Sequence, residues 1–355
     1  MSFENPSFGQ KSEKSLVEQS QEQMRNITKE MAEKSQYRRE RLSDLKEQIV
    51  SPEGENFLIE HVKDAESPDV KKIFKFMEKF NPEECDTIEI IQDAIENPTD
   101  AYAYHIIKDE KGKVIAHSES SYLEIPPENQ GDKPKEAVLF IGCNIVDDKH
   151  QRKGLGTEIC QTFFETGAKK AKNHEQSLKG IIGEAVETSE KFWNQVGMKR
   201  MYFEDGEGNI QEVPYICPPI QWDEKTGLPL DPETEEIGDK DIKEYSAPEH
   251  LMVRMIDGRQ EINASELLAM IGPVYTDNYT LYRNEGEEYP TDEAIGYSRK
   301  AVRGFRDELE AVLRKAKDGK IILLDAKERE EKIILPSGIP KKEIPALTRP
   351  FRVSP

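Results

Sequence analysis

The run Gln151-Arg152-Lys153-Gly154-Leu155-Gly156 contains two basic residues followed by two glycines that are separated by one leucine. An apolar run at 136–146 precedes it and an apolar pattern of helical spacing at 155–172 follows it, so the glycines fall between an expected strand and an expected helix. The first N–H groups of a helix have no internal partner, its dipole is positive there, and glycine lets the backbone approach an anion closely. This order predicts a phosphate-binding loop, although its spacing matches neither a Walker loop nor GxGxxG.

Acidic side chains in two other expected strands are candidates for proton transfer. Glu184 interrupts the apolar run at 180–186, and Glu119 alternates with His117 onto one face of the expected strand at 114–123. If Glu184 is buried among apolar residues, its pKa is expected to rise, which suits a general base. If it lies at a strand end in water, it is an ordinary surface carboxylate, and the sequence alone allows both. His117 is more simply interpreted as a surface histidine.

The elements that would position these residues follow a regular order. Hydrophobic periodicity and turn signals predict strands at 57–62, 101–107, 114–123, 136–146, 178–186 and 198–203. The same signals predict helices at 67–80, 86–96, 155–172 and 189–196. The segment 125–135 contains three prolines and a glycine and is expected to be a loop.

The glycine run and its surroundings resemble the acetyl-CoA motif of the GNAT superfamily of N-acetyltransferases. That motif reads Arg or Gln, two residues, Gly, one residue, then Gly or Ala, and Gln151, Gly154 and Gly156 meet it. The segment 191–198 also resembles the end of a GNAT domain, with an aromatic residue, three residues, Gly and a hydrophobe. The expected elements stand in the GNAT order of strand, two helices, three antiparallel strands, motif helix, strand, helix and closing strands. The resemblance covers the central domain only, residues 53–205.

This resemblance implies an α/β fold with a mixed central sheet, in which the strands before and after the motif helix splay apart. Acetyl-CoA would be the acyl donor, with its pyrophosphate on the glycine run and its pantetheine arm along backbone on the preceding strand. The implied cofactor-binding residues are Asn144, Val146, Gln151, Arg152, Lys153, Gly154, Leu155 and Gly156. The implied reaction is direct attack of a primary amine on the thioester carbon, and no metal ion is expected to take part.

The sequence departs from the common GNAT pattern at two positions. Trp193 stands where many relatives have the tyrosine that protonates the leaving thiolate, and Phe140 stands where protein-lysine acetyltransferases often have a glutamate. Neither ring can exchange a proton at ordinary pH. Glu184 and Glu119 are therefore the candidate catalytic residues, acting on a small cationic amine or a lysine side chain. The alternative is a catalytically weak or inactive CoA-binding or interaction module of the same fold.

Residues 1–52 are expected to be a helical or partly disordered extension in front of this domain. They contain Glu, Gln, Lys and Arg in abundance, and two stretches have apolar residues at helical spacing: Met24, Ile27 and Met31, then Leu42, Leu45 and Ile49. Such amphipathic stretches pack on the main domain or on a partner. A homodimer through this extension, or through the C-terminal region, is therefore possible.

Two regions are expected behind the domain. Residues 206–250 form a Pro-rich, acidic linker or arm, whose aromatic residues suggest that it lies on a surface. Residues 251–355 are expected to form a small α-rich region docked on the first domain. Its expected elements are a strand at 251–256, helices at 264–271 and 292–316, a brief strand at 321–324 and an irregular end after Leu335.

The composition limits the class of partner. The chain has 355 residues, of which 34% are charged, and a formal net charge of −20. This charge disfavours nucleic acid and anionic membranes and favours a cationic substrate, although acidity can also serve solubility alone. The cysteines at 85, 143, 160 and 217 form no CxxC or Cys/His spacing, so a zinc site or a redox pair is not expected. No apolar run reaches about 18 residues and the first residues lack signal-peptide features, so a cytoplasmic protein is expected.

Overall fold

The computed structural model describes residues 15–80, 82, 85–97, 101–127, 135–219, 221–231, 234, 236–237, 241–246, 248–281 and 288–333. Its strands are β1 (Arg38–Arg41), β2 (Lys46–Val50), β3 (Asn56–Val62), β4 (Tyr102–Lys108), β5 (Val114–Ile125), β6 (Glu136–Val146), β7 (Ser177–Ala185), β8 (Lys199–Glu204), β9 (Ile210–Glu212), β10 (Tyr215–Ile216), β11 (Pro248–Met255), β12 (Glu261–Asn263) and β13 (Lys320–Leu324). Its α-helices are α1 (Leu16–Lys34), α2 (Pro68–Phe80), α3 (Ile88–Glu96), α4 (Leu155–Asn173), α5 (Glu190–Gln195), α6 (Ala264–Pro273), α7 (Asp292–Leu313) and α8 (Ala326–Ile333). The irregular end expected after Leu335 lies outside the described residues.

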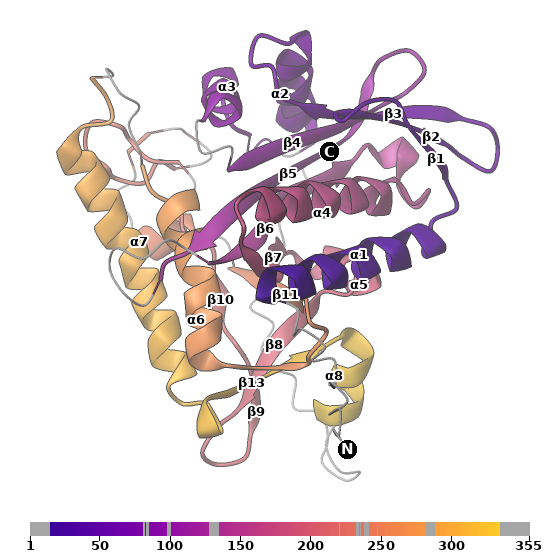
Figure 1. Cartoon of the computed structure of the whole chain (residues 1–355). Helices are drawn as coiled ribbons and strands as arrows, with labels where there is room; N and C mark the ends of the chain where they lie inside the picture. Colours follow the sequence, from indigo (N-terminus) through magenta and orange to yellow (C-terminus); the bar gives the residue numbers. More distant parts are fainter. Residues whose placement is uncertain are drawn as a thin grey trace, which may run out of the picture.

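One mixed sheet runs through the described part of the chain, in the order β1-β2-β3-β4-β5-β6-β7-β11-β8-β13-β12, with β9 on β8 and β10 on β11 (Figure 1). Among the described strands all neighbours pair antiparallel except β6 and β7, which run parallel. A parallel pair needs a long crossover, and α4, which begins at the glycine loop, supplies it. The expected α/β fold with a mixed central sheet is confirmed.

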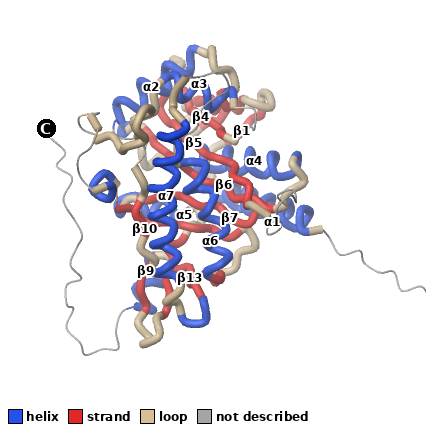
Figure 2. The backbone as a smooth tube through the Cα atoms, turned by 90° about the vertical axis from the view of Figure 1, so that its left-hand side faces the viewer, coloured by secondary structure: helices blue, strands red, loops and turns tan. Residues whose placement is uncertain are grey.

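Helices cover both faces of this sheet. α1 and α4 pack on one face, whereas α2 and α3 cover part of the opposite face and α6 and α7 cover another part of it (Figures 1 and 2). Neighbouring residues of β4 show the alternation between the two faces. Tyr104 packs under α2 and α3, while His105 contacts Thr166 of α4, with 3.2 Å between Nε2 and Oγ1.

Helix α1 confirms that the first apolar stretch of the N-terminal extension is helical. It begins at Ser15, whose hydroxyl accepts a hydrogen bond from the N–H of Glu18. Its buried residues Met24, Ile27 and Met31 belong to the same apolar cluster as α4 and β7. Because this chain already covers the apolar face of α1, that face is not open to a second copy.

The prediction of a helix at the second apolar stretch, Leu42 to Ile49, is wrong. Residues 38–50 form the hairpin β1–β2, and β2 pairs with β3 across the expected domain limit at residue 52. Ile49 is buried, but Leu42 and Leu45 lie at the turn and are 52% and 39% exposed. Ser43 closes this turn by accepting a hydrogen bond from the Leu45 N–H. The edge of β3 offers unpaired backbone groups, and pairing with them outweighs a weak helical periodicity.

The strand expected at 251–256 exists as β11, but it lies inside the sheet, between β7 and β8. Residues 206–250 therefore connect two adjacent strands of one sheet. Four of their buried side chains join the apolar cluster under α6 and α7: Val213, Tyr215, Cys217 and Trp222. β13 and β12 extend the same sheet beyond β8. The expected limits at 205 and 250 thus fall within a continuous network of sheet hydrogen bonds, which argues against a linker followed by a docked subdomain.

Helix α7 is the long amphipathic helix expected near the C-terminus. Thr291 caps it by accepting a hydrogen bond from the Ala294 N–H, and Val302, Phe305 and Leu309 are buried on its inner side. These residues pack into the cluster that also holds α6 and the inner face of β8, β11 and β13. Among the described residues, no helix is both long and apolar enough to cross a bilayer.

Candidate functional site

The glycine loop closes onto the first turn of α4. Arg152 and Gly154 have positive φ angles of 61° and 88°, and Gly154 immediately precedes the helix. A side chain at Gly154 would strain this turn, because only glycine adopts such a conformation readily. Leu155 is buried and anchors the turn. No side-chain hydrogen bond caps the start of α4 among the described residues. The N–H of Thr157 donates to the Gly154 carbonyl at 3.0 Å, which leaves the N–H groups of Leu155 and Gly156 for an anion.

Two side chains of the loop brace it instead of facing a ligand. Gln151 donates from Nε2 to the carbonyl of Val146 at 3.1 Å and to Asp148 Oδ1 at 2.9 Å. Lys153 Nζ lies 3.2 Å from Glu55 Oε2. Of the residues predicted to bind the cofactor, Gln151 and Val146 are therefore partly engaged with each other. The backbone of the loop, more than its side chains, is left to contact an anion.

The N-terminal region supplies a further brace that the sequence did not reveal. The hydroxyl of Tyr37 donates to the Lys153 carbonyl at 2.7 Å, and Gln36 Nε2 donates to the same oxygen at 2.9 Å. Burial, and then the charge of Glu158, raise the pKa of Tyr37 to about 12, so its hydroxyl remains a donor. No spacing signal connects residue 37 with residue 153, and only the fold brings them together.

Strands β6 and β7 separate at the end nearest the glycine loop. Their parallel pairing ends at Ile141 and Gly183, while β6 continues to Val146 paired with β5 alone. The residues beyond this point, from Gly142 onward, are exposed or half-buried, whereas residues 137–141 of β6 are buried. The expected splay of the sheet is therefore present, and β6 offers an open backbone edge within it.

A β-bulge marks the point of separation. Glu119 of β5 pairs with Cys143, and the next residue, Ser120, pairs with Ile141, so Gly142 is the extra residue of β6. Such a bulge bends its strand and leaves one residue outside the ladder. Here it turns the end of β6 away from β7 and frees backbone groups at the split.

Asn144 connects the open edge of β6 to the first turns of α4. Its Nδ2 donates to Cys160 Sγ at 2.9 Å and to the Gly156 carbonyl at 3.4 Å. Its Oδ1 is buried without a hydrogen-bond partner among the described residues, so it can accept an N–H from a ligand. A Cβ added to Gly156 would lie 3.1 Å from the ring of Phe192 and 3.7 Å from Val146, so a larger residue here would crowd that ring. These features fit a pantetheine arm followed by a pyrophosphate.

Glu184 comes directly after the last residue of β7 that pairs with β6. Tyr215 donates its hydroxyl to Oε1 of Glu184, and Tyr279 donates to Oε2. Burial, and then the charge of Glu184, raise the pKa of Tyr215 well above its usual value, and burial has the same effect on the pKa of Tyr279. Both hydroxyls are therefore fixed donors that stabilise the carboxylate. Glu184 fits neither of the two expectations, because it is neither bare in water nor surrounded only by apolar groups.

Glu119 lies beside the bulge, in a second polar cluster. A Cβ added to Gly142 would be 3.7 Å from Oε1 of Glu119. His117, Glu119 and Cys143 each place one nitrogen, oxygen or sulfur atom that could ligate a metal within 4.8 Å of the others. His117 is only 1% exposed, and burial lowers the pKa of its imidazole to about 4. The expectation of a surface histidine was wrong because strand alternation shows which residues share a face, not what covers that face.

The two predicted carboxylates lie on the same face of the sheet, away from α4. Ile182, two residues before Glu184, packs into the cluster under α6 and α7, whereas Ile181 packs with α4. Glu119 lies directly opposite Tyr104, which packs under α2 and α3. Residues that face each other across an antiparallel pair share a side of the sheet. The split in the sheet thus has one carboxylate on each flank.

The two positions that depart from the GNAT pattern are part of the apolar core. Phe140 is buried, and its ring lies edge to face with Tyr279, with 6.5 Å between the centroids. Trp193 is also buried and contacts Phe192, with 4.8 Å between the ring centroids. Neither side chain offers a group for proton transfer, as the sequence indicated.

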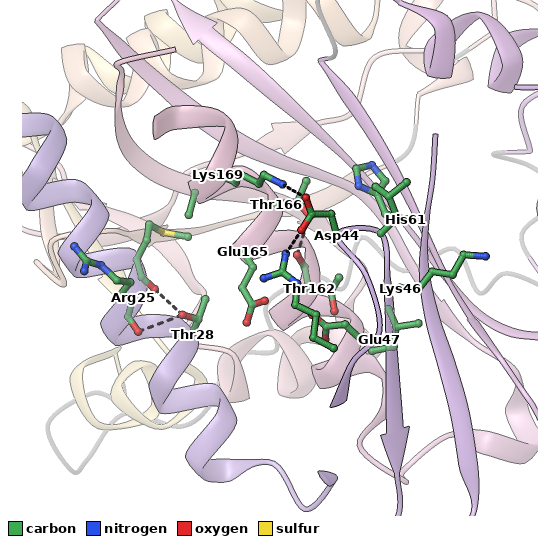
Figure 3. A pocket seen from close by; sticks show the side chains of 15 residues that line it. Arg25, Thr28, Asp44, Lys46, Glu47, His61, Thr162, Glu165, Thr166 and Lys169 are labelled. Carbon is green, nitrogen blue, oxygen red and sulfur yellow. Dashed lines mark hydrogen bonds and ion pairs between the residues drawn. The ribbon is translucent and has the colours of Figure 1, made fainter. Parts of the chain in front are cut away.

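A separate cavity of about 300 Å³ lies between α1, the β1–β2 hairpin and α4 (Figure 3). Charged and hydroxyl side chains line much of it, and Asp44 links Arg41 and Lys169 at its rim. No residue of the glycine loop lines this cavity. It is therefore distinct from the split between β6 and β7.

No family model and no curated protein matches the chain. Solved structures resemble part of it. An aminoglycoside acetyltransferase from an uncultured soil metagenomic sample is 14% identical, and the match covers 40% of this chain and 87% of that chain with a TM-score of 0.32. A Trypanosoma brucei acetyltransferase is 14% identical, with 40% and 91% covered and a TM-score of 0.31. NAA60 of Arabidopsis thaliana, in complex with acetyl-CoA, is 9% identical, with 56% and 99% covered and a TM-score of 0.36.

The central part of this chain has a GNAT-like fold by its own architecture. Its elements from β3 to β8 stand in the order that the sequence resemblance implied. The single parallel strand pair of the described sheet separates beside a bulge, and the glycine loop and α4 follow directly.

Proposed function

We propose that this protein is an acetyl-CoA-dependent N-acetyltransferase that acts on a primary amine, either a small cationic amine or a lysine side chain. The observation that carries this proposal is the split between β6 and β7 at the bulge, with the uncapped start of α4 at the same end. An open strand edge can bind an extended amide-containing arm, and a helix start can bind its phosphates.

The cofactor-binding residues have distinct tasks in this proposal. The backbone of residues 152–156 holds the pyrophosphate, with Arg152 adding a positive charge from the exposed side. The backbone edge at 142–146 and Asn144 Oδ1 hold the pantetheine amides. Bound acetyl-CoA would supply the thioester, with its acyl group beside the bulge. Gln151 and Leu155 keep the loop in shape.

The two carboxylates serve the amine. A primary amine must lose a proton to attack an acyl carbon, and a carboxylate beside the bulge is placed to accept it. Glu119 fits this role because it lies against Gly142, at the point where the sheet opens. Glu184, held by Tyr215 and Tyr279, contributes a fixed negative charge on the other flank, which attracts an ammonium group. The net charge of −20 favours the same class of substrate.

The test is release of free CoA thiol from acetyl-CoA in the presence of polyamines, small amine metabolites and lysine-containing peptides. We expect release to rise with at least one primary amine. The matched control is the N,N-dimethyl analogue of each amine, which has a similar charge and shape but cannot form a stable amide. Release that is the same with and without every amine of the panel contradicts the proposed reaction.

The burial of Phe140 and Trp193 in the core favours one alternative, a CoA-binding or interaction module without turnover. Calorimetric titration with CoA separates the two functions. Binding of CoA without thiol release across the panel supports the module, whereas binding with amine-dependent release supports the enzyme.

A further inference from the structure

We propose that His117, Glu119 and Cys143 bind one zinc ion on the face of the sheet away from α4. The sequence did not predict this site, because the three residues follow no metal-binding spacing. The proposal rests on the geometry of this cluster. It shares Glu119 with the proposed acetyl transfer, so zinc bound here would occupy the carboxylate that accepts the proton in that reaction.

Strand register holds the three side chains together. His117 and Glu119 are two residues apart in β5 and therefore point to the same face. Cys143 of β6 lies directly opposite Glu119. One nitrogen, one oxygen and one sulfur atom of these residues lie within 4.8 Å of one another. The backbone of two paired strands, not the chance position of flexible surface side chains, sets this arrangement.

The second observation is the orientation of His117. Its Nδ1 lies 3.1 Å from the carbonyl oxygen of His105, which can only accept, so Nδ1 carries the proton and Nε2 carries a lone pair. Nε2 is buried and has no hydrogen-bond partner among the described residues. Metal-binding histidines commonly donate their other N–H to a carbonyl in this way. A buried lone pair without a donor is costly to leave unsatisfied, and a cation at this point satisfies it.

The charges of the cluster suit a divalent ion. On binding, the thiol of Cys143 releases its proton to solvent, and the sulfur coordinates as thiolate. One thiolate and one carboxylate then balance the two positive charges of the ion. The occupied site therefore carries no net charge. Because binding releases a proton, the affinity for zinc rises with pH.

The donor set selects zinc over the common hard cations. Imidazole and thiolate suit zinc, whereas calcium and magnesium prefer oxygen ligands. In a tetrahedral zinc site such donor atoms are about 3.4–3.6 Å apart, so side-chain rotations that bring them about 1 Å closer complete the site. Glu119 and Cys143 are half-buried. The cluster therefore has access to solvent, and water can occupy the fourth position.

A comparable cluster on the other flank provides an internal control. Donor atoms of Glu184, Cys217 and Glu249 also lie within 4.8 Å of one another. That cluster has no imidazole, and both carboxylate oxygens of Glu184 accept hydrogen bonds from tyrosines. Zinc would have to displace these donors, so we expect this second cluster not to compete.

The experiment uses the full chain, treated with a chelator, freed of it by gel filtration and kept reduced. Zinc is titrated in competition with a chromophoric chelator, and cobalt is added separately as a spectroscopic probe. We expect one equivalent of zinc to bind, and cobalt to produce a thiolate charge-transfer band. Cys143→Ser should remove the band, and His117→Gln should weaken zinc binding by about 100-fold or more. Cys217→Ser, the matched control, should keep both the cobalt band and the wild-type affinity for zinc.

Two results overturn the proposal: absence of competing zinc uptake by the wild-type chain, or a cobalt band that Cys217→Ser abolishes and Cys143→Ser leaves unchanged. Circular dichroism shows whether each variant folds. If His117→Gln fails to fold, Cys143→Ser and the cobalt spectrum still decide the matter. No measurement contains acetyl-CoA, so a failure of the proposed acetyl transfer leaves the result intact.

Discussion

The two flanks of the split in the sheet are built in different ways. On the β6 flank, the bulge at Gly142, the carboxylate of Glu119 and the glycine loop all come from residues 117–156. On the β7 flank, Glu184 is held by Tyr215 and Tyr279, which are 31 and 95 residues away in the sequence. The first flank is therefore local in sequence, and the second depends on the C-terminal region.

In the proposed reaction, this difference separates binding of the cofactor from binding of the acceptor amine. Under that proposal, the β6 flank would hold the CoA arm and supply the proton acceptor. The β7 flank has a carboxylate whose two oxygens are already hydrogen-bonded and whose partners belong to the core under α6 and α7. Changes on the β6 flank should therefore remove function with little loss of stability. Changes on the β7 flank should affect both.

We expect the largest effect from Gly156→Val on the β6 flank. An added Cβ would lie 3.1 Å from the ring of Phe192, and the valine methyls would obstruct the first turn of α4. Calorimetry should show CoA affinity falling by about 100-fold, or about 2.7 kcal/mol. Gly304→Val in α7 is the matched control, because an added Cβ there meets no described atom within 4 Å. Wild-type affinity in Gly156→Val would remove the loop from cofactor binding.

Glu119→Gln should lower kcat by about 100-fold, because an amide of the same shape cannot accept a proton. Affinity for CoA should stay within about two-fold, since the loop is untouched. Steady-state kinetics with a chelator present keep zinc out of the comparison. Glu124→Gln, in the exposed part of the same strand, is the control and should keep the wild-type kcat. A normal kcat in Glu119→Gln would exclude its role in proton transfer.

Glu184→Gln should lower kcat by about ten-fold and leave CoA binding nearly unchanged. It should also lower the unfolding midpoint, because Tyr215 and Tyr279 lose a charged acceptor. Parallel kinetics and thermal unfolding test both parts. A loss of kcat larger than that of Glu119→Gln would reverse the comparison and make Glu184 the principal base.

Tyr279→Phe should reduce the free energy of unfolding by about 1–2 kcal/mol, since it removes a hydrogen bond to a charged group. The ring contact with Phe140 is retained, so packing is preserved. Urea unfolding measures the change, with Tyr297→Phe on the exposed side of α7 as the control. Equal stability of both variants would show that the C-terminal region does not hold Glu184 energetically.

The smallest effect is expected from Tyr37→Phe. The variant removes one of the two donors to the Lys153 carbonyl, while Gln36 keeps the other. The loop should become slightly less well positioned, and the Kd for CoA should rise by about three-fold, or about 0.7 kcal/mol. A change in Kd as large as that of Gly156→Val would mean that the N-terminal region, and not the glycine turn, dominates the loop.

Local features of the sequence predicted the glycine loop and several of the long helices. The glycine at 154 requires a positive φ angle, and helix periodicity gave α4, α7 and the buried stripe of α1. The same periodicity failed at Leu42 and Leu45, because pairing with an open strand edge outweighs a weak helical pattern. Alternation placed His117 and Glu119 on one face, but it carried no information about the helices that cover that face.

By itself, the sequence determined the glycine loop, the long helices and strands and the GNAT-like order of elements, because each depends on residues within a few turns of one another. Only the tertiary structure decided that β11 enters the sheet between β7 and β8, that Tyr37 braces the loop and that two distant tyrosines hold Glu184. It also decided that Cys143 lies opposite Glu119. These contacts arise from strand register and from hydrogen bonds between residues far apart in the chain, and no local pattern of side chains specifies either.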